Sequence, residues 1–218
     1  MIRLAPRHNP QKTSASSATS AFQDFAFVFW LRVSNENLLN TKIRPSKNSA
    51  SGTDAGYNWL NMTPRQSILL ADLEKAARMA LDASALMDHI SHHLHGSVAR
   101  YNWVGFYLVD KATPRSLVLG PHAGSFTPVE RISFDQGLCG AAADTGKTVL
   151  VNQVADDIRY LPGSDLVKSE IVVPVFAKTV LIGEVDINSY FAGTFTPDEQ
   201  EFVEACAALA GRYFEKHL

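Results

Sequence analysis

The sequence predicts an α+β domain with a mainly antiparallel sheet, and three observations lead to this class. Apolar residues recur with helical spacing after Pro64 and again after Pro197. Between these stretches lie several short runs of β-branched and aromatic residues, separated by turns. The last two runs, within residues 168–189, are joined by a turn too short for a crossover helix, so they pair as a hairpin. Helices at both ends with hairpins between them indicate α+β.

The 218 residues divide by composition into a tail and a domain. Residues 1–61 are rich in Ser, Asn, Thr and Ala, show no sustained period, and hold seven Lys/Arg against three Asp/Glu. Such a segment has little to bury, so we expect a disordered basic tail, with at most a short helix or strand over residues 25–33. Residues 62–218 form the predicted domain. We expect Met62 to be the natural start, and a targeting or interaction tail is the alternative.

The domain is predicted to begin and end with helices. Thr63 and Pro64 provide a cap and a first-turn proline, and the apolar pattern that follows fits one or two helices up to about Leu94. The final helix starts with the cap and acidic first turn of residues 196–199. It is expected to bury a stripe at helical spacing, formed by Phe202, Cys206, Leu209 and Tyr213.

The middle of the domain is predicted to be mostly strands. Turn residues flank each short apolar run, and the last two runs form the hairpin of residues 168–189. A short helix is expected from Gly137 through Ala143, and a loop broken by Pro162-Gly163 over residues 155–167. The remaining strands are expected over residues 103–109, 116–120, 129–132 and 148–151.

Composition narrows the classes of function. A hydrophobic content of 46%, a charged content of 19% and a formal net charge of −2 describe a globular protein with ample core. They give no general case for binding nucleic acid or a membrane. The longest apolar run, residues 25–31, is far shorter than the about 20 residues of a membrane span. Two cysteines cannot build a disulfide framework, so we expect a reducing compartment, the cytoplasm.

Polar side chains gather on one face of the predicted hairpin. Alternation places Ile182, Glu184, Asp186 and Asn188 on the same face of the second strand, and Glu170 opens the first strand. A hairpin with one solvated face explains this pattern, and composition favours that interpretation. The alternative is a polar floor beneath a small-molecule pocket.

Cys139 lies where the short helix is expected to begin. Backbone N–H groups at a helix N-terminus lower a thiol pKa and favour the thiolate, which would make this cysteine reactive. A buried core cysteine is the alternative. Cys206, on the apolar stripe of the last helix, is expected to be a core residue.

Two further residue pairs have suggestive spacing. Trp103 and Tyr107 are four apart in a strand and point the same way, so they either wall a pocket with their N–H and O–H donors or pack in the core. His89 and His93 have the spacing of a metal-binding pair on a helix, but no Glu lies between them. We expect a solvated helix end there and no metal site. No nucleotide or flavin motif is present, so no cofactor is expected.

Five short motifs together carry a family resemblance. They are NWVGFY from Asn102, LVLGP from Leu117, GLCG from Gly137, SEIVVP from Ser169 and GEVDINS from Gly183. In order and approximate spacing they resemble the free methionine-(R)-sulfoxide reductases, which are single GAF domains. The resemblance covers about residues 64–217. It implies the GAF fold, an antiparallel sheet of about six strands with helices on one face and a loop-covered pocket on the other.

The resemblance also implies a set of site residues. In that family an aromatic pair and three acidic positions hold free methionine sulfoxide. By motif, those positions are Trp103, Tyr107, Glu170, Asp186 and Asn188 in this chain. A carboxylate can bind the ammonium group of the amino acid, and a protonated carboxyl can donate to the sulfoxide oxygen. The last position is usually Asp in the family, so Asn188 removes one charge.

The chain departs from the family in its cysteines. The family has three, and only the second is matched, by Cys139. The first falls at Pro128 or Thr127, and the third, usually the attacking one, falls at Gly163. Cys206 matches none of them, and we expect it to lie too far from Cys139 for a disulfide.

Three functions follow from this reading. The first is a module that binds a small, amino-acid-like ligand of the methionine sulfoxide type and is catalytically impaired. The second is an active reductase in which Cys139 attacks and an external thiol, such as a thioredoxin-like reductant, resolves. The third is a regulatory or dimerisation module, which is disfavoured because no output segment follows Leu218. The resemblance also suggests a homodimer.

Overall fold

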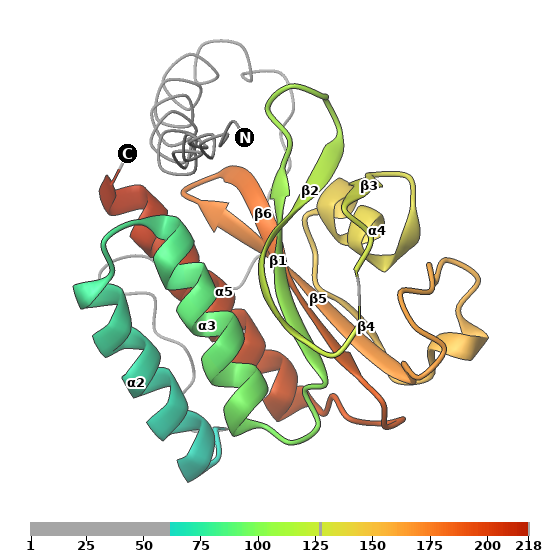
Figure 1. Ribbon diagram of the computed structural model, residues 1–218, viewed down its shortest axis with the longest axis horizontal. Helices are drawn as coiled ribbons and strands as arrows, with labels where there is room; N and C mark the ends of the chain where they lie inside the picture. The colour runs from blue at the N-terminus through green and yellow to red at the C-terminus, as the bar shows by residue number, and fades with distance from the viewer. Residues whose placement is uncertain (1–61, 127, 218) are drawn as a thin grey trace, which may run out of the picture. The chain divides into compact units, whose positions relative to one another are not determined.

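Residues 62–126 and 128–217 are described by the computed structural model, and their elements confirm the predicted α+β class (Figure 1). The predictions for residues 1–61 lie outside the described residues. Along the chain the elements are α2 (Pro64–Met79), α3 (Ala83–Ser97), β1 (Trp103–Val109), β2 (Ser116–Gly124), β3 (Arg131–Ser133), α4 (Gly137–Thr145), β4 (Val149–Val151), the 3₁₀ turn η1 (Val154–Asp156), β5 (Ser169–Ala177), β6 (Val180–Ser189) and α5 (Pro197–His217).

The helical stretch after Thr63 is two helices, and each has its own cap. The Gln66 N–H donates to Thr63 Oγ1 at 3.2 Å, and the Thr63 N–H donates to Gln66 Oε1 at 2.8 Å, which makes a capping box at the start of α2. Asp82 starts α3 by accepting a hydrogen bond from the Ala85 N–H at 2.7 Å. The second cap explains why the apolar pattern is interrupted between the two helices.

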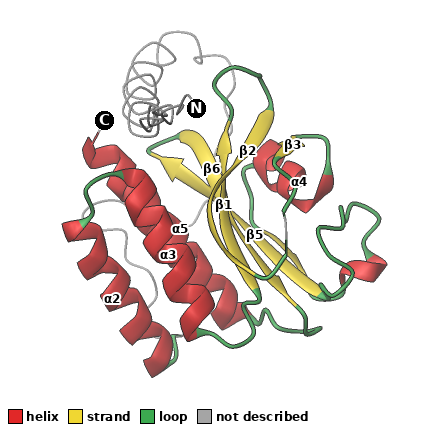
Figure 2. Cartoon of the chain, in the orientation of Figure 1, coloured by secondary structure: helices red, strands yellow, loops and turns green. Residues whose placement is uncertain are grey.

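The sheet separates two unequal layers (Figure 2). Helices α3 and α5 pack on one face, and α2 packs against both of these helices. The predicted stripe of α5 is buried, at Phe202, Cys206, Leu209 and Tyr213. Helix α4 lies on the other face, against β3, β5 and β6. The arrangement confirms helices on one face of the sheet and leaves the other face to α4 and its flanking loops.

Six strands form one sheet in the order β3-β2-β1-β6-β5-β4, and every neighbouring pair is antiparallel. Strand β2 is longer than predicted, because β1 pairs with it as far as Trp103 opposite Gly124. Pro121 is tolerated in this extension since the ladder between β3 and β2 covers only residues 116–118, with the bond from the Leu119 N–H to the Glu130 carbonyl at 2.9 Å just beyond it. Strand β3 starts at Arg131, two residues later than predicted.

No helix among residues 62–126 and 128–217 is long and apolar enough to cross a membrane.

We predict that Gly211→Ala destabilises the protein, because α5 approaches β5 closely at this residue. A Cβ on Gly211 would come within 2.1 Å of the Phe176 carbonyl oxygen. Overpacking of this kind costs about 1–3 kcal/mol of unfolding free energy, measurable by urea denaturation. Gly96→Ala is the matched control, since nothing lies within 4 Å of its Cβ position in α3. That change should stabilise by up to about 1 kcal/mol, and equal effects of the two changes would contradict the packing argument.

Candidate functional site

Antiparallel register brings the predicted site residues into neighbouring rows across the sheet. Asn188 of the central strand β6 lies between Trp103 of β1 and Glu170 of β5. In the next row, Asp186 of β6 lies opposite Gly105 of β1. Residues two apart on a strand share a face, so these polar side chains and the indole project from the same side of the sheet.

Trp103 lies over Gly105, which leaves room for it by having no side chain. A Cβ on Gly105 would come within 2.2 Å of the indole ring. The ring also stacks on Phe126, with centroids 5.5 Å apart, and on His122, with centroids 5.7 Å apart. Among the described residues the buried indole Nε1 has no hydrogen-bond partner. Trp103 therefore presents a fixed aromatic surface and one unused donor.

The polar face of the hairpin is buried, so the interpretation as a solvated face is wrong. Glu170, Asp186 and Asn188 are only 5–6% exposed. Glu184, which lies opposite Tyr107 of β1 on the same face, is fully buried. Helix α4 packs on β5 and β6 and excludes water from this face. The alternation of polar residues along β6 was read correctly, but the layer that covers them cannot be seen in the strand itself.

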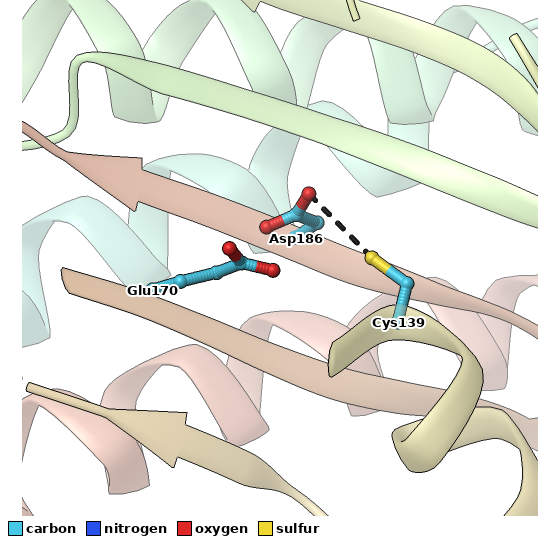
Figure 3. A group of neighbouring side chains, drawn as sticks. All are labelled: Cys139, Glu170 and Asp186. Carbon is cyan, nitrogen blue, oxygen red and sulfur yellow. Dashed lines mark hydrogen bonds between the residues drawn. The ribbon is translucent and has the colours of Figure 1, made fainter. Parts of the chain in front are cut away.

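Helix α4 places Cys139 directly above the carboxyl groups (Figure 3). The Cys139 thiol donates to Asp186 Oδ2 at 3.7 Å, and the Asn188 side-chain amide donates to Asp186 Oδ1 at 2.8 Å. A Cβ on Gly140 would lie 2.5 Å from the Ser133 carbonyl oxygen, so the glycine after the cysteine lets α4 approach the end of β3. The helix start thus fixes the sulfur over the pocket floor.

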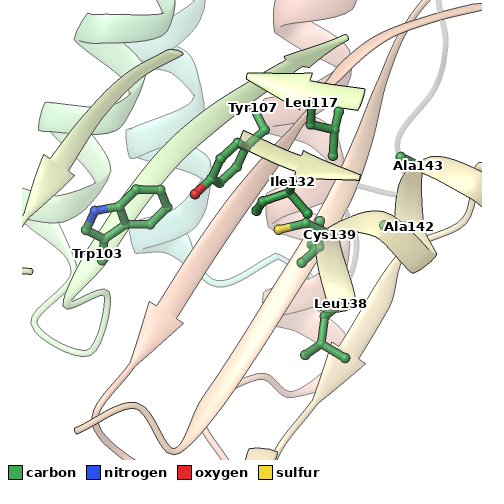
Figure 4. Close-up of a cluster of buried hydrophobic side chains, with 9 residues drawn as sticks. Trp103, Tyr107, Leu117, Ile132, Leu138, Cys139, Ala142 and Ala143 are labelled. Carbon is green, nitrogen blue, oxygen red and sulfur yellow. The ribbon is translucent and has the colours of Figure 1, made fainter. Parts of the chain in front are cut away.

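Cys139 is buried, as the core-cysteine alternative expects, and its surroundings oppose the thiolate form that a helix start would favour. Burial raises the pKa of its thiol well above the ordinary value, and the carboxyl groups of Glu184, Asp186 and Glu170 raise it further. Cys139 also belongs to a buried apolar cluster that includes Leu117, Ile132, Leu138 and Ala142 (Figure 4). A helix N-terminus contributes only about 0.3–1 kcal/mol in favour of an anion, which is less than the effect of burial beside several acidic groups.

The carboxyl groups themselves are held partly in the neutral form. Burial raises the pKa of Asp186 to about 7, although hydrogen bonds from Cys139 and Asn188 oppose the change. Burial also raises the pKa of Glu170, with a further increase from the neighbouring Asp186 and Glu184. The pKa of Glu184 rises for the same reason, burial first. The site therefore favours protons or another positive charge.

The cavity over this floor is small and only partly enclosed. Its volume is about 30 Å³, enough for one or two water molecules. Phe126 and Leu161 lie over it from the loops on either side of α4, and Leu161 is itself 40% exposed. The lining residues are Trp103, Tyr107, Phe126, Pro128, Val129, Ile132, Gly137, Leu138, Cys139, Leu161, Gly163, Glu170, Asp186 and Asn188.

All six residues predicted for the site line this one cavity. Gly163 and Pro128 also line it; the sequence resemblance places one family cysteine at Gly163 and another at either Pro128 or Thr127. Thr127 lies outside the described residues. The sequence reasoning missed Phe126 and Leu161, which lie in irregular loops without a periodic signal. It also left Glu184 out of the site, although alternation had placed it on the correct face.

The other candidate residues lie away from the cavity. His89 and His93 stack with ring centroids 5.5 Å apart on α3, and no third ligand joins them among the described residues. Cys206 is buried in α5, on the opposite face of the sheet from α4. Both cysteines are free thiols.

The fold and the cavity define a GAF domain, and the comparison with protein families shows the same. The family described as "GAF domain" matches residues 80–215, and the chain belongs to this family.

The relatives include named reductases. The chain is 32% identical over 136 residues to the free methionine-R-sulfoxide reductase of Saccharomyces cerevisiae, covering 60% of this chain and 71% of the relative. It is 31% identical over 144 residues to GAF domain-containing protein A of Dictyostelium discoideum, covering 66% and 84%. The free methionine-R-sulfoxide reductase of Neisseria meningitidis, solved in complex with its substrate, superposes with a TM-score of 0.65 at 29% identity, covering 77% of this chain and 94% of that one.

We predict that stability falls as the pH rises from about 4 to 7, and that Asp186→Asn removes part of this fall. The folded-state pKa of Asp186 lies above its ordinary value of 3.8, so its contribution is fully present below about 4 and is lost as the pH rises through about 7. The expected slope is roughly 1 kcal/mol per pH unit in urea unfolding of the full chain.

Asp144→Asn is the control for this measurement, because Asp144 is an exposed carboxylate on α4. It should leave the slope unchanged. A slope that is the same in Asp186→Asn as in the unmodified protein would show that Asp186 is not held neutral by burial.

Proposed function

We propose that this GAF domain binds a small, amino-acid-like ligand of the methionine sulfoxide type in the cavity beneath α4, and that it is catalytically impaired. The observation that carries the proposal is the convergence of Trp103, Tyr107, Cys139, Glu170, Asp186 and Asn188 on one buried cavity. The relatives named as free methionine-R-sulfoxide reductases supply the ligand class.

The unpaired polar groups of the cavity match the two charged ends of an amino acid. The Trp103 N–H is a buried donor without a partner among the described residues, and a ligand carboxylate or sulfoxide oxygen would accept from it. Glu170 and Asp186 are buried acids with raised pKa values, and a ligand ammonium group would let one of them ionise. A zwitterion therefore provides partners for the polar groups of the cavity that have none among the described residues.

Ligand entry requires the loops over the cavity to open. Pockets for small molecules measure about 300–1,000 Å³, far more than the present space. Phe126 stacks on Trp103 where a bound ligand would contact the indole. The Tyr107 hydroxyl donates to the Val129 carbonyl at 2.8 Å, so the same aromatic pair holds this loop in place. In the proposal, the ligand displaces Phe126 and Leu161.

Impaired catalysis follows from the sulfur chemistry. A reductase needs a thiolate to attack the sulfoxide sulfur, which releases methionine after a proton reaches the oxygen and leaves a sulfenic acid on the enzyme. An external thiol then forms a mixed disulfide with release of water, and a second thiol reduces it. Cys139 is the thiol available in the cavity, and burial beside acids keeps it protonated. The positions at Pro128 and Gly163 carry no sulfur.

The alternative is an active reductase in which Cys139 performs the attack. Ligand entry and ionisation of the acids that bind it would change the surroundings of this thiol. A thioredoxin-like reductant would then reduce the oxidised Cys139. A cytoplasmic location and a homodimer fit either function. No feature of the described residues favours a nucleic acid or a membrane as partner.

Free L-methionine-(R)-sulfoxide should stabilise the full chain against thermal unfolding more than its (S) epimer does. At 100 times its Kd a ligand adds about 2.7 kcal/mol, a shift of several degrees. Trp103→Phe keeps an aromatic ring but removes the N–H, and we expect roughly tenfold weaker binding by calorimetry. Asp144→Asn, on the exposed side of α4, should bind as the unmodified protein does. Equal shifts with both epimers, or none, would contradict the ligand assignment.

Thiol-dependent turnover should be absent in the unmodified chain and should emerge when a cysteine is restored at Gly163. A Cβ there would lie 2.9 Å from the Phe126 ring, so the test uses Gly163→Cys both alone and together with Phe126→Ala. Phe126→Ala alone is the control. Turnover by the unmodified chain that is lost in Cys139→Ser would establish the reductase alternative. A silent double variant that still binds ligand would show that more than the nucleophile has been lost.

A further inference from the structure

The strongest unexplained feature is a set of metal-type ligand atoms on the pocket floor. Cys139 Sγ and carboxylate oxygens of Glu170 and Asp186 all lie within 4.8 Å of one another, and all three residues are buried (Figure 3). Among residues 62–126 and 128–217 this is the one group of three such side chains. The two carboxyl groups come from adjacent strands and the sulfur from α4, so three separate elements enclose the same point.

A second observation points to an occupant. Glu184 is fully buried, and neither of its carboxylate oxygens has a hydrogen-bond partner in the described part of the chain. It lies two residues before Asp186 on β6, so its side chain projects from the same face of the sheet as the cluster. Buried polar atoms are nearly always satisfied, and an orphaned carboxylate beside three ligand atoms indicates a missing positive partner.

We propose that Cys139, Glu170 and Asp186 bind a divalent transition-metal ion of the Zn²⁺ type, with Glu184 available as a fourth donor. One thiolate with carboxylates is a donor set that suits Zn²⁺ rather than Mg²⁺ or Ca²⁺, which prefer oxygen ligands alone. Tetrahedral Zn²⁺ with Zn–S and Zn–O distances of about 2.3 and 2.1 Å holds its donors about 3.5 Å apart, so binding would draw the more widely spaced atoms of the cluster together by up to about 1 Å. The cavity of about 30 Å³ is of a size for an ion rather than an amino acid.

The proposed metal site is independent of the proposed amino-acid ligand. The cation would bind while Phe126 and Leu161 stay in place. Because both occupants would use Glu170 and Asp186, they should exclude each other. Amino-acid binding is therefore measured in buffer with a chelator, and metal binding is measured without any amino acid.

The test is a titration of the full, metal-free chain with Co²⁺, which replaces Zn²⁺ and reports its ligands by absorption. We expect one Co²⁺ per chain, with the charge-transfer band of a cobalt–thiolate bond, and displacement of Co²⁺ by Zn²⁺. Cys139→Ser should abolish the band, and Glu170→Gln and Asp186→Asn should each weaken binding at least tenfold. The matched controls are Cys206→Ser, which removes the other buried thiol, and the double variant His89→Ala/His93→Ala. Both controls should bind Co²⁺ as the unmodified chain does.

Three results would overturn the proposal. They are the absence of a thiolate band at stoichiometric Co²⁺, a band that survives Cys139→Ser, and a band that is lost in the His89→Ala/His93→Ala variant. Thermal unfolding of each metal-free variant shows whether it folds. If Cys139→Ser does not fold, Glu170→Gln retains the thiol and decides the outcome, since unchanged Co²⁺ affinity in that variant would also refute the site.

Discussion

The carboxyl groups of Glu170, Glu184 and Asp186 are removed from water on a single face of the sheet. An ionised carboxylate in such a place costs several kcal/mol unless a positive group accompanies it, and three of them also repel one another. Among the described residues no ion pair that involves any of the three is present. The rest of the site is arranged around this constraint. Burial raises the pKa values of Glu170, Glu184 and the Cys139 thiol, and Phe126 and Leu161 line the cavity.

Much of the fold could be predicted because its signals are local. The cap at Thr63 and the first-turn proline are neighbours in the sequence, and the strand pattern of β6 follows from alternation. The second cap, at Asp82, was not predicted. Alternation also placed Glu184 and Asp186 on one face. That face is buried because α4 packs against it, and the sequence of β6 alone contains no signal of this contact. The solvated-face interpretation therefore failed at the step from local pattern to tertiary layer.

The protonation state of Cys139 could not be predicted for the same reason. The helix start that would favour a thiolate is visible in the Gly-Leu-Cys-Gly sequence, but the acids that oppose it lie 31 to 47 residues further along the chain. Phe126 was beyond prediction for a different reason. It lies in an irregular loop, and its role arises only from contact with Trp103 on β1. In this domain, periodic elements supply the floor of the cavity and aperiodic loops supply its cover.

Charge balance connects the two proposed occupants. An ammonium group and a divalent metal ion are chemically unlike, but each would supply the positive charge that the buried acids lack. They differ in what they require of Cys139, because a metal ion binds the thiolate whereas an amino acid can bind while the thiol stays protonated. They also differ in what they require of Phe126 and Leu161, because an ion fits beneath the Phe126 ring and an amino acid does not. In the two proposals, the position of the Phe126 ring, stacked on Trp103 or displaced from it, would decide which kind of cation the acids hold.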